Sequence, residues 1–171
     1  MATQTYTSSS TWQAPEGCSA VKVTARGGGA AGAAYGAVFS RPGGGGGGGA
    51  YALKAAIAVT PGITYNVTVG AEAVCVPAWD IDGNPSSFVG DASATCAAAG
   101  GKGAYDRIGG AGGGITSPTV GDTVYAGGAG GTPTGVAISR TLAEGTLCEF
   151  RSECAHYDRD FVDRVPVVML H

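Results

Sequence analysis

The chain is poor in the side chains that usually build a protein core. Its 171 residues include only 4 Phe, 7 Tyr, 2 Trp and 2 Met, and alanine supplies much of the 44% hydrophobic content. Burying a large apolar side chain gains roughly 1.5–3 kcal/mol, whereas an alanine methyl gains much less. We therefore expect a thin core, or one shared with other copies in a homo-oligomer, with a trimer favoured.

Charge and long apolar runs are also scarce. Charged residues make up 13% of the chain, the net charge is −3, and there is no basic run, so the electrostatic signature of a nucleic-acid partner is missing. No apolar run reaches the roughly 18 residues that cross a bilayer, and residues 1–4 do not resemble a secretory signal. We expect no nucleic-acid partner, no membrane insertion and synthesis in a reducing bacterial cytoplasm. The cysteines do not form the pattern of a small disulfide framework; they are Cys18, Cys75, Cys96, Cys148 and Cys154.

Glycine, in contrast, is abundant. The chain has 32 glycines in 171 residues, more than twice the usual share of about 7%. Each glycine loses more backbone freedom on folding than any other residue. Such a chain either stays disordered or recovers the cost through dense backbone hydrogen bonding and partner chains. The low charge and the recurring blocks of Val, Ile, Thr and Tyr favour order.

Short β-forming blocks separate the glycine clusters. Residues 21–26 alternate apolar and polar side chains, which is typical of a half-buried strand. Residues 51–59 and 63–69 flank a Thr-Pro-Gly turn, which predicts a β-hairpin. Further short strands are predicted in residues 3–8, 11–13, 87–89, 123–125 and 136–138. The sequence therefore predicts an all-β fold.

The glycine clusters themselves allow two structures. Gly43–Gly49 is a run of seven glycines, and further clusters occur at 100–103, 109–114 and 127–131. Extended polyproline-II-like helices pack closely where side chains are missing, as in collagen, but the strict period of three is absent here. Packed polyglycine-II-like helices and irregular loops at the end of a β-sandwich both remain open, and a pure linker fits less well.

The composition changes near Arg140. Residues 1–139 hold 31 of the 32 glycines and 13 of the 23 charges, and residues 140–171 hold one glycine and the other 10 charges. We interpret 1–139 as a glycine-rich β domain and 140–171 as a charged C-terminal docking segment. Its expected assembly anchor consists of Phe150, Tyr157, Phe161 and Val165.

Motifs for nucleotides, metals and catalysis are incomplete. Gly43–Gly49 leads into β-formers, not into the helix of a dinucleotide site, and Gly101-Lys102-Gly103 lacks the Ser or Thr of a phosphate loop. Asp80, Asp82 and Asn84 have the spacing of the first calcium-loop ligands, but Gly83 comes one place early and the later glutamate is missing.

Neither residues 140–171 nor the carboxylates of Asp80, Asp82 and Asp91 form a motif for zinc binding or hydrolysis. Cys148, Cys154 and His156 do not have the usual spacing of a zinc site. No Gly-x-Ser-x-Gly elbow occurs, and the candidate glycosidase carboxylates lie at turn positions without a visible apolar pocket. We expect a protein that is not an enzyme and has no cofactor and no metal.

Several elements in a fixed order resemble a known family. They are Thr11-Trp12-Gln13-Ala14-Pro15-Glu16-Gly17, Val21-Lys22-Val23, the glycine run, Tyr65-Asn66-Val67-Thr68-Val69-Gly70, Ser86-Ser87-Phe88-Val89-Gly90 and Tyr125-Ala126-Gly127-Gly128. Over residues 3–139 the chain is similar to the glycine-rich domains of phage tail fibres and receptor-binding tip proteins. This resemblance implies a β-sandwich or jelly-roll-like module on a phage particle.

We therefore expect a virion structural protein, a tail-fibre or tail-tip adhesin subunit that contacts other virion proteins and a host receptor or glycan. Rigid aromatic rings bind at low entropic cost, and the candidate surface-binding residues are Tyr35, Phe39, Trp79, Asp80, Asp82 and Tyr105. The alternative is a capsid decoration or head-fibre protein. An extracellular ice-binding or matrix protein is more distant, since it requires strict period-three glycine.

Overall fold

The computed structural model describes residues 3–33, 43–74, 81–133 and 168–170. They form short strands and one 3-10 turn: β1 (Gln4–Tyr6), β2 (Ser10–Gln13), β3 (Ala20–Arg26), β4 (Tyr51–Ala58), β5 (Thr64–Thr68), β6 (Ser86–Val89), η1 (Asp91–Ser93), β7 (Thr95–Ala98), β8 (Thr123–Tyr125) and β9 (Val168–Leu170).

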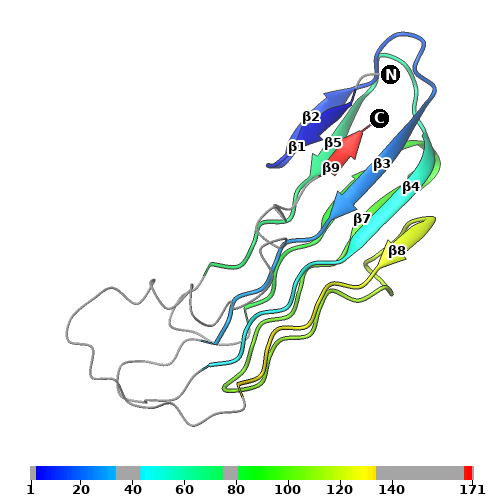
Figure 1. Ribbon diagram of the computed structural model, residues 1–171. Helices are drawn as coiled ribbons and strands as arrows, with labels where there is room; N and C mark the ends of the chain where they lie inside the picture. Colours follow the sequence, from blue (N-terminus) through cyan, green and yellow to red (C-terminus); the bar gives the residue numbers. More distant parts are fainter. Residues whose placement is uncertain (1–2, 34–42, 75–80, 134–167, 171) are drawn as a thin grey trace.

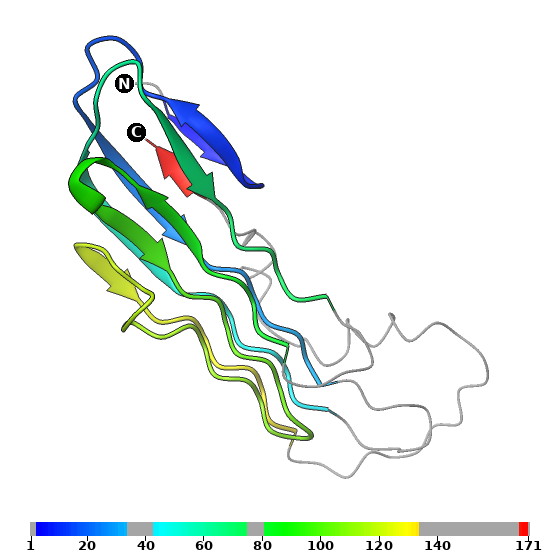
Figure 2. The same ribbon diagram turned by 180° about the vertical axis from the view of Figure 1, so that it is seen from behind.

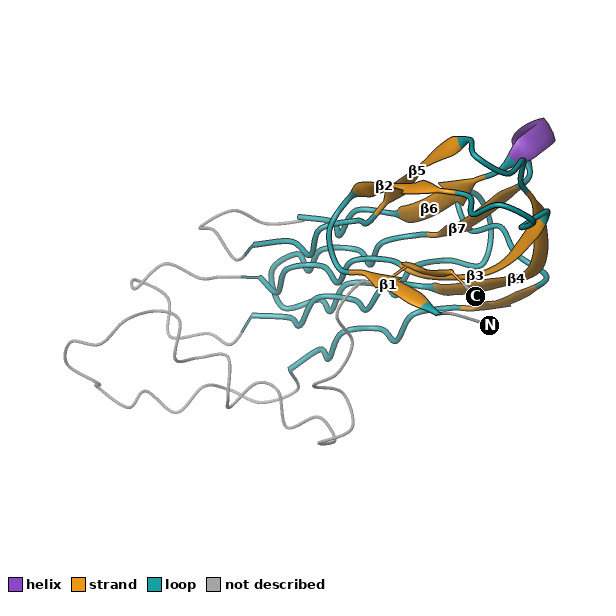
Figure 3. Cartoon of the chain, turned by 90° about the horizontal axis from the view of Figure 1, so that it is seen from above, coloured by secondary structure: helices purple, strands orange, loops and turns teal. Residues whose placement is uncertain are grey.

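The strands make two antiparallel sheets that stack face to face (Figures 1 and 3). One sheet has the order β1-β9-β3-β4-β8, and the other has the order β2-β5-β6-β7. The predicted all-β sandwich is confirmed, and its description as jelly-roll-like stays a prediction. The alternating burial along β5, in which Tyr65 and Val67 are buried between exposed neighbours, is the pattern of a strand with one face on a core.

The core between the sheets is thin, as the composition predicts. The largest fully buried side chains are Phe88, Ile57, Val23, Val67 and Cys96, and much of the remaining core is alanine. Trp12, Tyr65 and Phe88 form an aromatic cluster with ring centroids about 6 Å apart, a separation at which aromatic pairs attract. These few large side chains therefore provide most of the apolar packing.

The Tyr65 hydroxyl of this cluster takes part in a hydrogen-bond network with Thr60 and Asp91. The Tyr65 hydroxyl donates to Asp91 Oδ1 at 2.6 Å and accepts the Thr60 N–H at 2.7 Å. The Thr60 hydroxyl donates to the other oxygen of Asp91 at 2.8 Å. Because all three groups are hydrogen-bonded, the turn after β4 is fixed against η1.

The predicted hairpin between residues 51–59 and 63–69 is wrong. The Thr-Pro-Gly turn exists, with Gly62 at φ 81°, but it connects the two sheets. β4 pairs with β3 and β8, and β5 pairs with β2 and β6. The two strands therefore belong to different sheets, and each contributes buried residues to the core, Ile57 from β4 and Val67 from β5.

Other strands match their predictions in part. β1, β2, β3, β6 and β8 lie where β-forming blocks predict them, and residues 136–138 lie outside the described residues. β7 is not predicted, because its sequence Thr-Cys-Ala-Ala contains one β-branched residue. β9 belongs to the segment assigned to docking, yet it pairs with β1 and β3 inside the sandwich.

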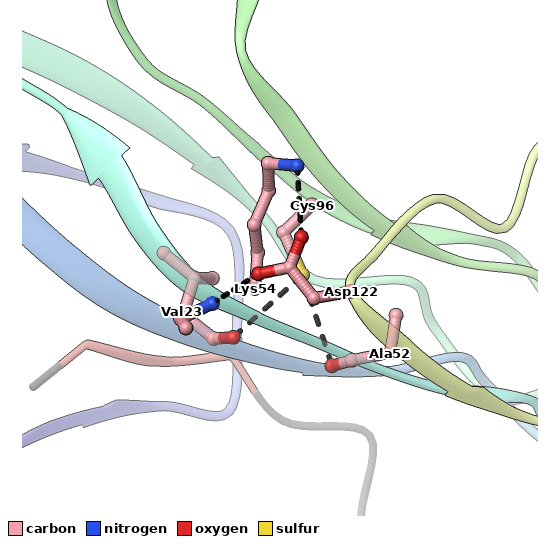
Figure 4. A network of polar contacts seen from close by, with 6 residues as sticks. Val23, Ala52, Lys54, Cys96 and Asp122 are labelled. Carbon is pink, nitrogen blue, oxygen red and sulfur yellow. Dashed lines mark hydrogen bonds and ion pairs between the residues drawn. The ribbon is translucent and has the colours of Figure 1, made fainter.

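Polar contacts tie the loop before β8 to the sandwich (Figure 4). Asp122 accepts the Ala55 N–H at 2.7 Å and contacts Lys54 Nζ at 3.3 Å. The backbone hydrogen bond from Ala55, followed by the one from Lys54, holds the pKa of Asp122 below its usual value. Nearby, the buried Cys96 thiol lies 3.7 Å from the carbonyl oxygens of Val23 and Ala52.

Candidate functional site

Seven extended segments, five of them rich in glycine, leave the sandwich and run side by side away from it (Figures 1 and 2). We call them the glycine bundle, and we call the end that lies away from the sandwich the distal end. Each segment continues a strand or returns the chain to one. The segments are 27–33, 43–50, 69–74, 81–85, 99–104, 109–114 and 126–133.

Hydrogen bonds between these segments repeat every three residues. The N–H groups of residues 27, 30 and 33 donate to the carbonyls of residues 50, 47 and 44 at 2.9–3.0 Å. In the same way, residues 45 and 48 donate to residues 131 and 128. Three residues per turn is the period of the polyproline II helix, and among the described glycines only Gly17 and Gly62 have positive φ. The glycine clusters are therefore packed extended helices, and the alternative of irregular loops is wrong for these segments.

The run Gly43–Gly49 has other segments on all sides, which explains why glycine is required at residues 43, 44, 46, 47 and 49. A threefold helix has three faces, and each face of this run meets another segment. A Cβ on two of the faces would come within 3.0 Å of backbone atoms, and on the third face within 3.2 Å of Gly131 N. The residues concerned are 43, 46 and 49 against segment 27–33, 44 and 47 against residues 108–112, and 45 against residues 130–131.

Segment 126–133 is peripheral and needs fewer glycines. A Cβ at Gly127 or Gly130 would overlap the carbonyl groups of Gly48 or Gly45, whereas a Cβ at Gly128 would have no described atom within 4 Å. The spacing of three between the two crowded positions follows from the helix period. The bundle thus requires glycine on the faces that meet another backbone and tolerates other residues elsewhere.

A tight turn forms part of the distal end. Tyr105 and Ile108 exchange backbone hydrogen bonds of 3.2 and 2.9 Å, and Asp106 between them has φ 54°. Tyr105 is 55% exposed and Ile108 is 64% exposed; Val74, at the end of segment 69–74, is 70% exposed. Apolar and aromatic side chains therefore lie open to solvent where the bundle ends.

Asp82 joins two segments near this end. Its carboxylate forms an ion pair with Lys102 Nζ and accepts the Gly103 N–H at 2.9 Å. The hydrogen bond from Lys102 is the largest cause that lowers the pKa of Asp82, and the bond from Gly103 acts in the same direction. The carboxylate therefore holds segment 81–85 against segment 99–104.

The predicted surface-binding residues divide into two groups. Tyr105 is exposed at the distal turn, and the Asp82 carboxylate forms an ion pair with Lys102 within the bundle. Tyr35, Phe39, Trp79 and Asp80 lie outside the described residues. The described residues that flank 34–42 lie close together, since the Ala33 N–H donates to Gly44 O at 2.9 Å.

The anchor prediction falls outside the described residues. Phe150, Tyr157, Phe161 and Val165 are not among the described residues. The same holds for Cys148, Cys154 and His156, which were considered as zinc ligands. Sequence reasoning missed the exposed Val74 and Ile108. The sequence signal for Ile108 is an apolar residue that lies between two glycine clusters, 100–103 and 109–114.

The described residues offer few groups for catalysis or metal binding. Nowhere in them do three or more His, Cys, Asp or Glu side chains gather closely enough for a metal ion. Of the cysteines within the described ranges, Cys18 and Cys96 are free, and burial raises the pKa of Cys96 to about 11. Among the same residues, no helix has the length and apolar character to cross a membrane.

A sandwich that extends into a glycine bundle agrees with the result of the family comparison. A family model described as a glycine-rich domain matches residues 3–147. The chain belongs to this glycine-rich domain family. Among curated proteins, none matches the chain. The family match includes every described segment of the chain except β9.

The bundle predicts opposite effects for two alanine substitutions. We expect Gly47→Ala to destabilise the domain by about 3 kcal/mol or more, because the new methyl meets backbone on a crowded face. Gly128→Ala, its matched control, is expected to be neutral or to stabilise by about 0.4–1 kcal/mol. Denaturant unfolding of both variants measures the difference. Equal free energies of unfolding would contradict the packed-helix description.

The Asp82–Lys102 pair predicts a pH effect. A carboxyl with a lowered pKa contributes stability above its unfolded value, and this contribution is lost as the pH falls through the folded value. Because the pair is substantially exposed, we expect Asp82→Asn to cost at most about 1 kcal/mol at pH 7. At pH 2 the variant and the natural chain should unfold at the same urea concentration. A difference that persists at pH 2 would show that lost geometry, not charge, causes the effect.

Proposed function

We propose that this glycine-rich domain is a phage virion surface protein, a tail-fibre or tail-tip adhesin subunit that contacts the host at its distal end. The separation of the distal end from the sandwich carries this proposal. β1 and β9, the first and last strands described, both lie in the sandwich. The glycine bundle extends from the sandwich (Figure 1), so the distal end is available for contact with another surface.

The bundle suits a projecting support because its segments are tied laterally. Every segment of the bundle makes a backbone hydrogen bond to another segment or to a neighbouring loop residue. Such bonds each contribute roughly 0.5–1.5 kcal/mol net to stability. Between neighbouring segments they repeat every three residues. Closely packed backbones therefore hold the described segments together with few side chains.

The exposed side chains at the distal end suit recognition. Tyr105 and Ile108 are exposed there, and amphipathic aromatic rings are frequent at binding surfaces. The segments that contain Tyr35 and Trp79 connect bundle segments, and both residues belong to the predicted binding set. A host receptor or a surface glycan is the partner that these side chains favour.

Substitutions at the two ends of the domain test this function. We expect the double variant Trp79→Ala and Tyr105→Ala to lower the binding of labelled protein to cells of the host strain at least tenfold. Tyr125→Ala serves as the matched control, since Tyr125 is 63% exposed but belongs to β8 in the sandwich. Equal binding by all variants would contradict a distal recognition surface.

The position of the chain on the particle distinguishes the tail from the capsid. We expect an antibody against this domain to label tail fibres or the tail tip of purified particles in electron micrographs. Labelling over the head would instead support the alternative, a capsid decoration or head-fibre protein. Particles without label at either place would contradict a virion role.

A further inference from the structure

Strand β9 completes the sandwich from the far end of the chain. It lies between β1 and β3 and pairs antiparallel with both. Thr5 of β1 and Thr24 of β3 are both opposite Met169. Among the described strands, β1 pairs only with β9. The first strand is therefore joined to the sheet through three residues near the C-terminus.

The position between β1 and β3 is a binding site for an extended strand. Two backbone ladders face it, one on each side, and the adjacent Tyr6 side chain of β1 is buried in the core. Addition of a strand to open sheet edges is a common mode of peptide recognition, with main-chain hydrogen bonds providing the affinity. Here the strand is inserted between two edges and gains hydrogen bonds on both sides.

The connection to β9 is long. Segment 126–133 runs toward the distal end, where the Pro133 carbonyl accepts a hydrogen bond from Arg107 in the distal turn at 3.2 Å. The chain next enters the described residues at Val168 in the sandwich, so residues 134–167 join the two ends of the domain. At roughly 3.3–3.6 Å per extended residue, this length reaches on the order of 110 Å. A connection of that length is long enough to carry Val168–Leu170 to a second copy.

We propose that the site between β1 and β3 accepts Val168–Leu170 from a second copy of this chain, so that copies interlock by exchange of the C-terminal strand. The exchanged strand makes the same contacts as the chain's own strand would, which is why such exchange is a low-cost route to oligomers. A connection of this length gives the chain's own strand only a modest advantage, because effective concentration falls as a linker lengthens. The thin core adds a reason to associate, since each copy buries few large side chains alone.

A disulfide formed between different chains tests the exchange. Thr5 and Met169 lie directly opposite each other in the β1–β9 ladder. Chains with Thr5→Cys and chains with Met169→Cys, distinguished by mass, are co-expressed and oxidised. Peptide mapping then identifies the 5–169 disulfide. Because each chain carries only one of these two cysteines, this disulfide can only connect two different chains, and we expect it to form. A matched control with Ser8→Cys, which lies outside the β1–β9 ladder, should give little linkage to position 169.

The unmodified chain provides a second measurement that needs no substitution. We expect light scattering at about 100 µM to give an oligomer. A monomer in that measurement would overturn the proposal. So would a 5–169 disulfide that forms within single chains given both substitutions but does not form between the two single variants. Host binding is measured separately at the distal end, so the adhesin function and the strand exchange can fail independently.

Discussion

The distance between neighbouring backbones in the glycine bundle determines most of this structure. The extended helices approach so closely that a single Cβ would overlap a carbonyl group of the next segment, as at Gly47 against Ala111. Only glycine permits that approach, and the approach brings N–H and carbonyl groups into hydrogen-bonding distance every third residue. The unusual composition is therefore a requirement of backbone packing.

The sandwich and the bundle depend on each other. Glycine loses much conformational entropy on folding, and a bundle segment alone has few large apolar side chains with which to recover that loss. The sandwich fixes the starting register, because β3, β4 and β7 continue directly into segments 27–33, 43–50 and 99–104. In return, the bundle extends the ladders beyond a core in which Phe88 and Ile57 are the largest fully buried side chains.

Sequence reasoning identified the strands better than their pairing. The alternation in residues 21–26 and the β-branched run in 63–69 are local signals, and both segments are strands. Whether the Thr-Pro-Gly turn closes a hairpin or connects two sheets depends on distant partners, namely β2 for β5 and β3 for β4. The sequence also did not decide between packed helices and irregular loops for the glycine clusters, because helix packing likewise depends on distant segments. A glycine period of three appears only on peripheral segments such as 126–133, and the central run hides it because all three of its faces are covered. Of the predicted binding residues, Tyr105 has the exposure that recognition requires, whereas Asp82 has a partner, Lys102, that no local motif indicates.

The glycine bundle is an ordered, hydrogen-bonded lattice. Amide hydrogen exchange of the run Gly43–Gly49 tests it most directly. The packed-helix structure predicts that the N–H groups of residues 44, 45, 47 and 48, which donate to other segments, exchange as slowly as those of strand β4. Exchange of these amides within seconds at neutral pH, at the rate of an unfolded peptide, would contradict the account.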